Sequence, residues 1–268
     1  MTGTTVAVAQ FAPGSDDNLR SIAGLVEEAA GRGARLVVLP EYSAWFETPF
    51  TDALAAHAEL LDGPFTRELS RLADRFGVWI VAGLVERAEG TRVHNTVVAV
   101  DAGGVQASYR KQHLYDAFGD RESDRIAAGA LGAPQTFRLD DLTFGLMTCY
   151  DLRFPESARV LLDAGVDVIV VPAEWVRGPL KEDHWSTLIR ARAIENTAFV
   201  VAADQTPPIG VGRSMIVDPS GIVLASLGTQ PGVAIATLDR SELERVRQLN
   251  PALELRRYRV EPRDQSAG

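Results

Sequence analysis

The chain has 268 residues and a single cysteine, Cys149. One cysteine excludes an intramolecular disulfide, which is typical of proteins from a reducing compartment, and we expect a cytoplasmic location. No apolar run approaches the length that spans a bilayer, so we expect no membrane association. The first residues lack a basic segment followed by an apolar one, which argues against a signal peptide.

Positive charge is scarce, because 27 lysines and arginines face 36 aspartates and glutamates, for a net charge of −9. This balance argues against nucleic acid as the main partner. Neither a G-x-S-x-G motif nor a phosphate-binding glycine loop is present, so we expect no cofactor. We also expect no bound metal, because the few histidines show no paired ligand spacing; they are His57, His94, His113 and His184.

What the chain does contain is an alternation of strand-like and helix-like segments. Two hairpins are predicted as well, one with strands 93–100 and 105–109 and one that turns at 218–221. The predicted strands are 6–11, 36–39, 78–84, 142–147, 168–171 and 198–203, and the predicted helices are 16–31, 64–75, 155–164 and 183–196.

Three short segments of the first half have similar counterparts, in the same order, in the second half. The paired segments are 33–40 with 165–172, 78–82 with 198–202, and 100–105 with 217–222. The repetition predicts two similar α/β halves, and two packed sheets with helices outside would form an α-β-β-α sandwich. We expect one domain over 1–255, followed by a C-terminal tail over 256–268.

Cys149 lies at the junction between the predicted strand 142–147 and the predicted helix 155–164. A thiol at the carboxyl end of a sheet and next to the positive end of a helix dipole is expected to favour its nucleophilic thiolate form. The alternative is a buried structural cysteine that acts as a small hydrophobic residue.

Three charged residues also follow predicted strands or lie in a polar loop. Glu41 follows strand 36–39, Lys111 follows the first hairpin, and Glu122 lies in a glycine-containing loop. A carboxylate can accept a thiol proton, and a lysine can stabilise an oxyanion with help from the backbone N–H of Tyr150. These groups would suffice for acyl transfer, although each could instead be a cap, an edge residue or a solvated surface residue.

Four motifs, taken together and in this order, resemble the nitrilase superfamily of carbon–nitrogen hydrolases. They are PE at 40–41, YRKQHL at 109–114, CYDLRFPE at 149–156 and HWSTLIRARAIEN at 184–196. The resemblance implies a Glu–Lys–Cys triad, with Cys149 as the nucleophile, Glu41 as the general base and Lys111 as the oxyanion stabiliser. Glu122 would be the second glutamate, which positions substrate and lysine. The resemblance also implies a homodimer or larger homo-oligomer.

The residues after the nucleophile look most like the amidase branches that include ω-amidase and deaminated-glutathione amidase. There, Arg153 would bind a substrate carboxylate, although a salt bridge to Glu156 is the alternative. Glu174 is not typical of these branches, and its charge would disfavour a second substrate carboxylate. Trp175 would line the acyl pocket or be a core aromatic residue.

The main hypothesis is therefore a cysteine-dependent hydrolase that cleaves a linear carboxamide to acid and ammonia through a thioester. Its partner would be a small amide that carries a carboxylate. A nitrilase or an N-carbamoyl amidohydrolase with the same triad is one alternative, and a non-catalytic scaffold of the same fold is another.

Overall fold

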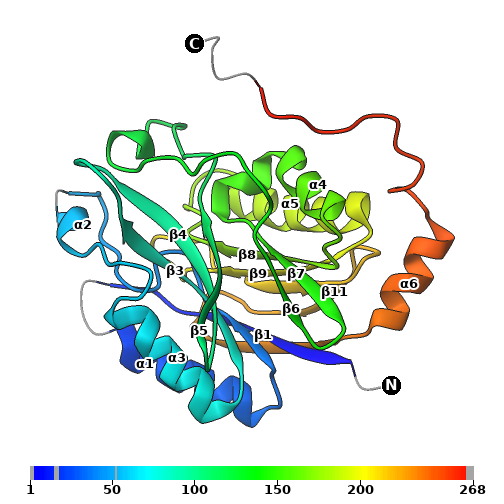
Figure 1. Ribbon diagram of the computed structural model, residues 1–268, viewed down its shortest axis with the longest axis horizontal. Coiled ribbons are helices and arrows are strands. Elements are labelled where there is room, and N and C mark those ends of the chain that lie inside the picture. The colour runs from blue at the N-terminus through cyan, green and yellow to red at the C-terminus, as the bar shows by residue number, and fades with distance from the viewer. Residues whose placement is uncertain (1–2, 15–17, 52, 264–268) are drawn as a thin grey trace.

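Two six-stranded sheets form the centre of the computed structural model, which describes residues 3–14, 18–51 and 53–263 (Figure 1). The first sheet has the order β12 (Gly232–Leu238), β1 (Thr4–Gln10), β2 (Leu36–Val38), β3 (Trp79–Arg87), β4 (Val93–Asp101) and β5 (Gly104–Arg110). The second has the order β6 (Thr136–Leu139), β7 (Leu142–Leu146), β8 (Val168–Ala173), β9 (Phe199–Asp204), β10 (Met215–Val217) and β11 (Val223–Ser226).

The two sheets share one pattern of strand directions, as expected for similar halves. In each sheet the second, third and fourth strands are parallel, and they are β1, β2 and β3 in one and β7, β8 and β9 in the other. An antiparallel strand borders the triplet on one side, and an antiparallel hairpin borders it on the other. Strand β12 comes from the C-terminal part of the chain but pairs with β1, so the first sheet is completed only when the whole chain has folded back.

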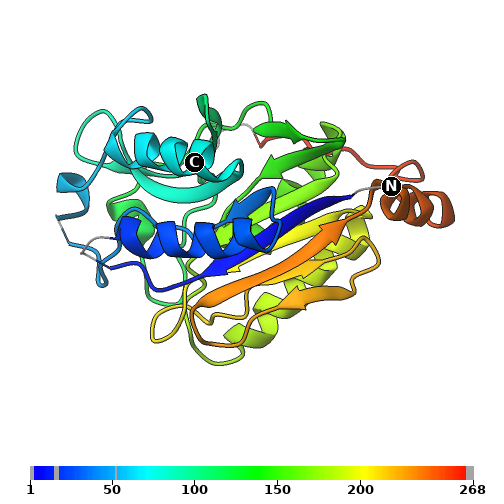
Figure 2. The same ribbon diagram turned by 90° about the horizontal axis from the view of Figure 1, so that it is seen from below.

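Helices cover the outer face of each sheet and complete an α-β-β-α sandwich (Figures 1 and 2). Helices α1 (Asn18–Gly31) and α3 (Pro64–Phe76) pack on the first sheet, and α4 (Pro155–Asp163) and α5 (Lys181–Asn196) pack on the second. The side chains of β2 show why both faces are apolar. Val38 belongs to the core between the sheets, whereas Val37 belongs to the core under the helices, because successive side chains of a strand point to opposite faces.

Helix α3 shows how local sequence sets element ends. Pro64 stands at its start, where a missing N–H costs nothing. Gly77 follows its last residue with φ 66° and donates its N–H to the carbonyl of Ala73, which is the usual way for a glycine to end a helix.

The predicted elements agree with the structure to within a few residues, except that residues 16 and 17 of predicted helix 16–31 lie outside the described part. The strands and α-helices of the described residues that escaped prediction are β6, β12, the short helix α2 (Ala53–Ala56) and α6 (Arg240–Leu249), and the two short 3-10 helices escaped it too. Residues 250–263 contain no helix or strand, and the domain boundary at 255 stays a prediction. No helix within the described residues has the length and apolar character needed to cross a membrane.

Candidate active site

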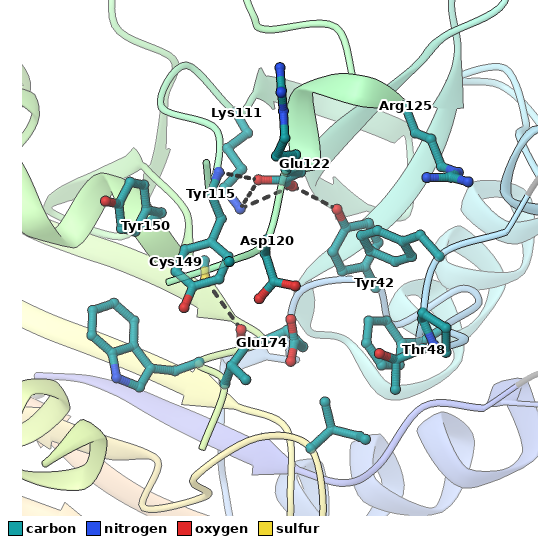
Figure 3. Close-up of a pocket in the computed structure, with 18 of the residues that line it drawn as sticks. Tyr42, Thr48, Lys111, Tyr115, Asp120, Glu122, Arg125, Cys149, Tyr150 and Glu174 are labelled. Carbon is teal, nitrogen blue, oxygen red and sulfur yellow. Dashed lines mark hydrogen bonds and ion pairs between the residues drawn. The ribbon is translucent and has the colours of Figure 1, made fainter. Parts of the chain in front are cut away.

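The four predicted catalytic residues come together from segments that lie far apart in sequence. Figure 3 shows three of them, Lys111, Glu122 and Cys149, around one cavity. Glu41 lies just beyond β2, and Lys111 directly follows β5. Glu122 opens the short 3-10 helix η1 (Glu122–Asp124), and Cys149 opens η2 (Cys149–Arg153) just beyond β7. All four are buried, with at most 6% of each residue exposed.

Lys111 lies between two carboxylates. Its Nζ is 3.0 Å from Glu41 Oε1 and 2.9 Å from Glu122 Oε2. Burial by itself would lower the pKa of Lys111, but attraction to Glu122 and Glu41 outweighs it and raises the pKa well above the usual value. The two carboxylates therefore favour the charged ammonium in a buried site, where it acts strongly on a nearby developing negative charge.

Glu122 is held as a carboxylate by the same group of residues. Burial would raise its pKa, but Lys111 and the N–H of Tyr115, 2.6 Å from Oε2, lower it below the usual value. The hydroxyl of Tyr42 donates to Glu122 Oε1 at 2.8 Å (Figure 3). The pKa of Tyr42 is in turn raised well above its usual value, mainly by burial and by the Glu122 charge.

Asn95, on β4, joins the two glutamates and was missed by the sequence analysis. Its Nδ2 donates to Glu41 Oε1 at 2.6 Å and to Glu122 Oε1 at 3.1 Å. The sequence signal is a run of three polar residues, 94–96, near the start of the strand, and that pattern does not tell which partner the Asn95 side chain meets.

Cys149 has an unusual backbone conformation, with φ 46°. Non-glycine residues rarely adopt positive φ, and such strain persists only where the surroundings hold it. The thiol donates to the carbonyl of Glu174 at 3.4 Å (Figure 3). The backbone N–H of Glu174 donates to Glu41 Oε2 at 2.7 Å. Glu174, which directly follows β8, thus contacts both the thiol and the Glu41 carboxylate through its backbone.

The expectation of a thiolate favoured by a helix dipole is wrong. The α-helix starts only at Pro155, because the short η2 turn comes between it and the strand. The pKa of Cys149 is raised well above its usual value by burial and by the negative charge of Glu41, which exceed the opposing effect of Lys111. The resting side chain is a neutral thiol, so it needs a base at the moment of attack.

Asp151 holds the turn that carries the nucleophile, and the sequence analysis assigned it no role. Its carboxylate accepts from the Tyr109 hydroxyl at 2.7 Å and from the backbone N–H of Thr148 at 3.1 Å. It also accepts from the backbone N–H of His113 at 3.1 Å, with His113 Nδ1 at 2.7 Å. Asp151 therefore ties η2 to both sides of Lys111 in sequence, and so fixes the nucleophile relative to the lysine.

A cavity of about 380 Å³ opens onto the site, and both Lys111 and Cys149 line it. Tyr150 and Arg153 line it too, and their substrate-binding roles stay predictions. Arg153 forms no ion pair with Glu156 or with any other described carboxylate. Among the described residues, no group of three His, Cys, Asp or Glu side chains is placed to bind a metal ion.

Glu174 lines the cavity, and its surroundings bear on the expectation that its charge would disfavour a second substrate carboxylate, which stays a prediction. Burial, with the charges of Glu41 and Asp204, raises the pKa of Glu174 well above the usual value, and its Oε1 is buried without a hydrogen-bond partner. A carboxyl that resists ionisation repels an anion less than a carboxylate does. Trp175 lines the cavity and also belongs to the core under α4 and α5, and its contact with an acyl group stays a prediction.

Comparison with known proteins agrees with this arrangement. The family model described as carbon-nitrogen hydrolase matches residues 5–248. The chain is 39% identical to a deaminated glutathione amidase of Escherichia coli O157:H7 over 94% of this chain and 97% of that protein.

Solved structures give the same result. The structure resembles the Caenorhabditis elegans NitFhit protein with a TM-score of 0.85 and 30% identity, covering 96% of this chain and 66% of that one. It also resembles a mutant of a Nesterenkonia amidase from the nitrilase superfamily, with a TM-score of 0.82, 26% identity, and coverage of 96% and 95%. The chain therefore belongs to the carbon-nitrogen hydrolase family and is an enzyme of its amidase branch.

Proposed function

We propose that the protein hydrolyses a linear carboxamide through a thioester on Cys149, with Glu41 as general base and Lys111 as oxyanion stabiliser. The observation that carries the proposal is the position of Lys111 Nζ, 3.0 Å from Glu41 and 2.9 Å from Glu122, beside a cavity that also exposes the thiol. Glu122 then has a positioning role, because it holds the ammonium in place without supplying the proton.

The first half of the reaction follows from the charges of the site. As the thiol sulfur attacks the amide carbon, its proton passes to Glu41, and the oxyanion forms against Lys111 and the backbone N–H of Tyr150. When the C–N bond breaks, Glu41 returns the proton to the leaving nitrogen, and the acyl group stays on sulfur as a thioester.

The second half uses the same groups in reverse. Water gives a proton to Glu41 and attacks the thioester carbon, and a second oxyanion forms in the same place. Its collapse breaks the C–S bond, the proton returns to sulfur, and the acid leaves. The neutral resting thiol is consistent with this cycle, because the sulfur is deprotonated only when a substrate carbon is ready to accept its electrons.

A carboxylate on the acyl part of the substrate is the second part of the proposal. Arg153 lines the cavity, and its guanidinium stacks 4.8 Å from the centroid of Trp175 without an acidic partner among the described residues. The name of the Escherichia coli relative makes deaminated glutathione one compound to test. Release of ammonia or of a larger amine would then depend on which amide is cleaved.

The decisive test replaces the nucleophile. Cys149→Ala should lower amide hydrolysis by at least about a thousandfold while the melting temperature stays close to that of wild type. Mass spectrometry of wild type mixed with a slowly hydrolysed amide should show an acyl adduct on Cys149, and the variant should show none. Retained turnover in Cys149→Ala would exclude the thioester mechanism.

The same panel separates the alternatives. Matched amides, nitriles and N-carbamoyl amines should be compared by kcat/KM, and we expect the amides to be preferred. A higher value for nitriles or carbamoyl compounds would assign the triad to those reactions, and a thiol that no electrophilic amide labels would favour a scaffold.

A further inference from the structure

Lys181 is a further cation in the same cavity, and nothing in the sequence motifs pointed to it. It is the first residue of α5, it is only 6% exposed, and it lines the cavity together with Arg153 and Cys149. Leu180, which precedes it, has φ 60°, so the chain turns sharply just before the side chain enters the cavity.

The ammonium of Lys181 has polar and aromatic neighbours but no acidic partner. Its Nζ donates to the hydroxyl of Tyr115 at 2.8 Å and lies 3.9 Å from the ring centroid of Phe118. It forms no ion pair with any described carboxylate. Burial and repulsion by Arg153 lower the pKa of Lys181 and outweigh the opposing attraction of Asp120 and Glu174.

Arg153 shares these surroundings. Its guanidinium carbon lies 5.6 Å from the same Phe118 ring, and its Nε is buried without a hydrogen-bond partner. One remaining contact is with His184, whose Nδ1 lies 3.3 Å from an Arg153 terminal nitrogen. Lys111, in contrast, has two glutamates. Lys181 and Arg153 therefore differ from Lys111 in having no carboxylate partner among the described residues, and they are the two cavity cations that share the Phe118 ring.

We propose that Lys181 and Arg153 together bind one substrate carboxylate, at the end of the acyl chain away from the scissile amide. Lys181 is then a specificity residue, and this inference rests on the proposed amidase function. Two partly buried cations around one aromatic ring repel each other, and a carboxylate between them removes that repulsion while Arg153 supplies a planar pair of donors. Asp120 also lines the cavity but is exposed, so water screens its charge.

The experiment compares charged and neutral substrates of equal length. The monoamides of straight dicarboxylic acids with four to six carbons are measured beside the primary amides of monocarboxylic acids of the same length. Lys181→Gln keeps a hydrogen-bond donor for Tyr115 but removes the charge. Tyr115→Phe removes the hydrogen bond but keeps the charge, and Lys181→Arg keeps both the charge and a donor.

We expect Lys181→Gln to raise KM for the charged amides by about tenfold or more, with kcat/KM for the neutral amides within about twofold of wild type. Lys181→Arg and Tyr115→Phe should stay close to wild type on both series. Equal losses on both series in Lys181→Gln, or a Tyr115→Phe variant as poor as Lys181→Gln, would mean that Lys181 only supports the loop over the cavity.

Calorimetric binding of the free dicarboxylates tests the inference without turnover. Wild type should bind the dicarboxylate of the preferred length, and Lys181→Gln should bind it about tenfold more weakly. If no amide is cleaved but this difference in affinity appears, the result supports carboxylate binding by Lys181 and Arg153 and contradicts the proposed amidase reaction. If amides are cleaved but both proteins bind the dicarboxylates equally, or wild type binds none, carboxylate binding by Lys181 and Arg153 is excluded while the amidase function is kept.

Discussion

At the scale of single residues, the site is a set of buried charges that hold one another in place. Lys111 stays charged because Glu41 and Glu122 outweigh the cost of burial, and Cys149 stays neutral because the nearby carboxylates add to that cost. The same carboxylates therefore have opposite effects on a cation and on a thiol. Rearranging their hydrogen bonds should change activity more than stability.

Asn95→Ala tests this directly. The change removes one donor shared by Glu41 and Glu122, so both carboxylates can move relative to Lys111. We expect kcat/KM to fall about 10- to 100-fold, because small displacements of catalytic groups cost that much. Steady-state kinetics on one good amide would measure it.

Thr96→Ala is the matched control for that change. Thr96 is the next residue on β4 and faces the other way, where its hydroxyl donates to Glu86 at 2.7 Å. For Thr96→Ala we expect the free energy of unfolding to fall by about 1–3 kcal/mol, while kcat/KM stays within about twofold of wild type. Similar losses of activity in both variants would mean that β4 acts only through general stability.

Glu174 makes a pH-dependent contribution. Its pKa is raised in the folded protein, so the stability that this carboxyl contributes is present at low pH and is lost as the pH rises through the folded-state pKa. Gln cannot ionise. The melting temperature of Glu174→Gln minus that of wild type should therefore become more positive between about pH 5 and about pH 8.

Thermal unfolding across this pH range measures the effect, with Glu89→Gln as the control. Glu89 is exposed, so the corresponding difference for its variant should stay nearly constant with pH. A flat difference for Glu174→Gln as well would show that the side chain ionises as freely as an exposed glutamate.

At the scale of elements, the position of Glu41 depends on a glycine in the neighbouring strand. A Cβ on Gly83, in β3, would lie 2.5 Å from the Tyr42 nitrogen and 2.7 Å from the Glu41 Cα. A backbone hydrogen bond also joins Gly83 to the segment after β2, because the N–H of Gly83 donates to the carbonyl of Pro40 at 3.2 Å. Only glycine allows this close packing of the two backbones.

Gly83→Ala should push the Glu41 segment away from the site. We expect kcat/KM to fall by about 100-fold or more, together with a loss of about 1–3 kcal/mol in stability. The control is Gly24→Ala in α1, where a Cβ meets no atom within 4 Å and the variant should gain about 0.5–1 kcal/mol. Normal activity in Gly83→Ala would show that the segment can shift without harm.

At the scale of the whole molecule, the reacting groups come from both sheets. Glu41 and Lys111 follow strands of the first sheet, and Cys149 follows a strand of the second. The core between the sheets includes Val38 and Phe144, so packing there sets the distance between the thiol and the lysine. Assembly of copies, which the family resemblance implies, would involve the outer surface.

Ile194 on α5 is a place to test assembly, because it is 46% exposed and lies against Gly221 near the exposed Ile222. We expect wild type to be a dimer or larger by light scattering, and Ile194→Glu to shift toward the monomer mass of 29.0 kDa. Leu60→Glu, at an exposed residue of the other half, should leave the assembly unchanged. A monomeric wild type would contradict the expectation.

The sequence by itself predicted the features that local pattern determines. Apolar periodicity located the strands and helices of the two halves, and the catalytic candidates were named from the four motifs that resemble the nitrilase superfamily. Strand β12 was missed because its partner β1 lies at the other end of the chain. Helix α6 was missed because it is short and strongly polar.

Only the tertiary structure decided the partners and the charges. Asn95, Asp151 and Lys181 act through contacts with residues on other elements, and no spacing in the chain encodes those contacts. The neutral state of Cys149 was also beyond the sequence. Burial and neighbouring charges set a pKa, and both depend on how the two sheets pack around the thiol.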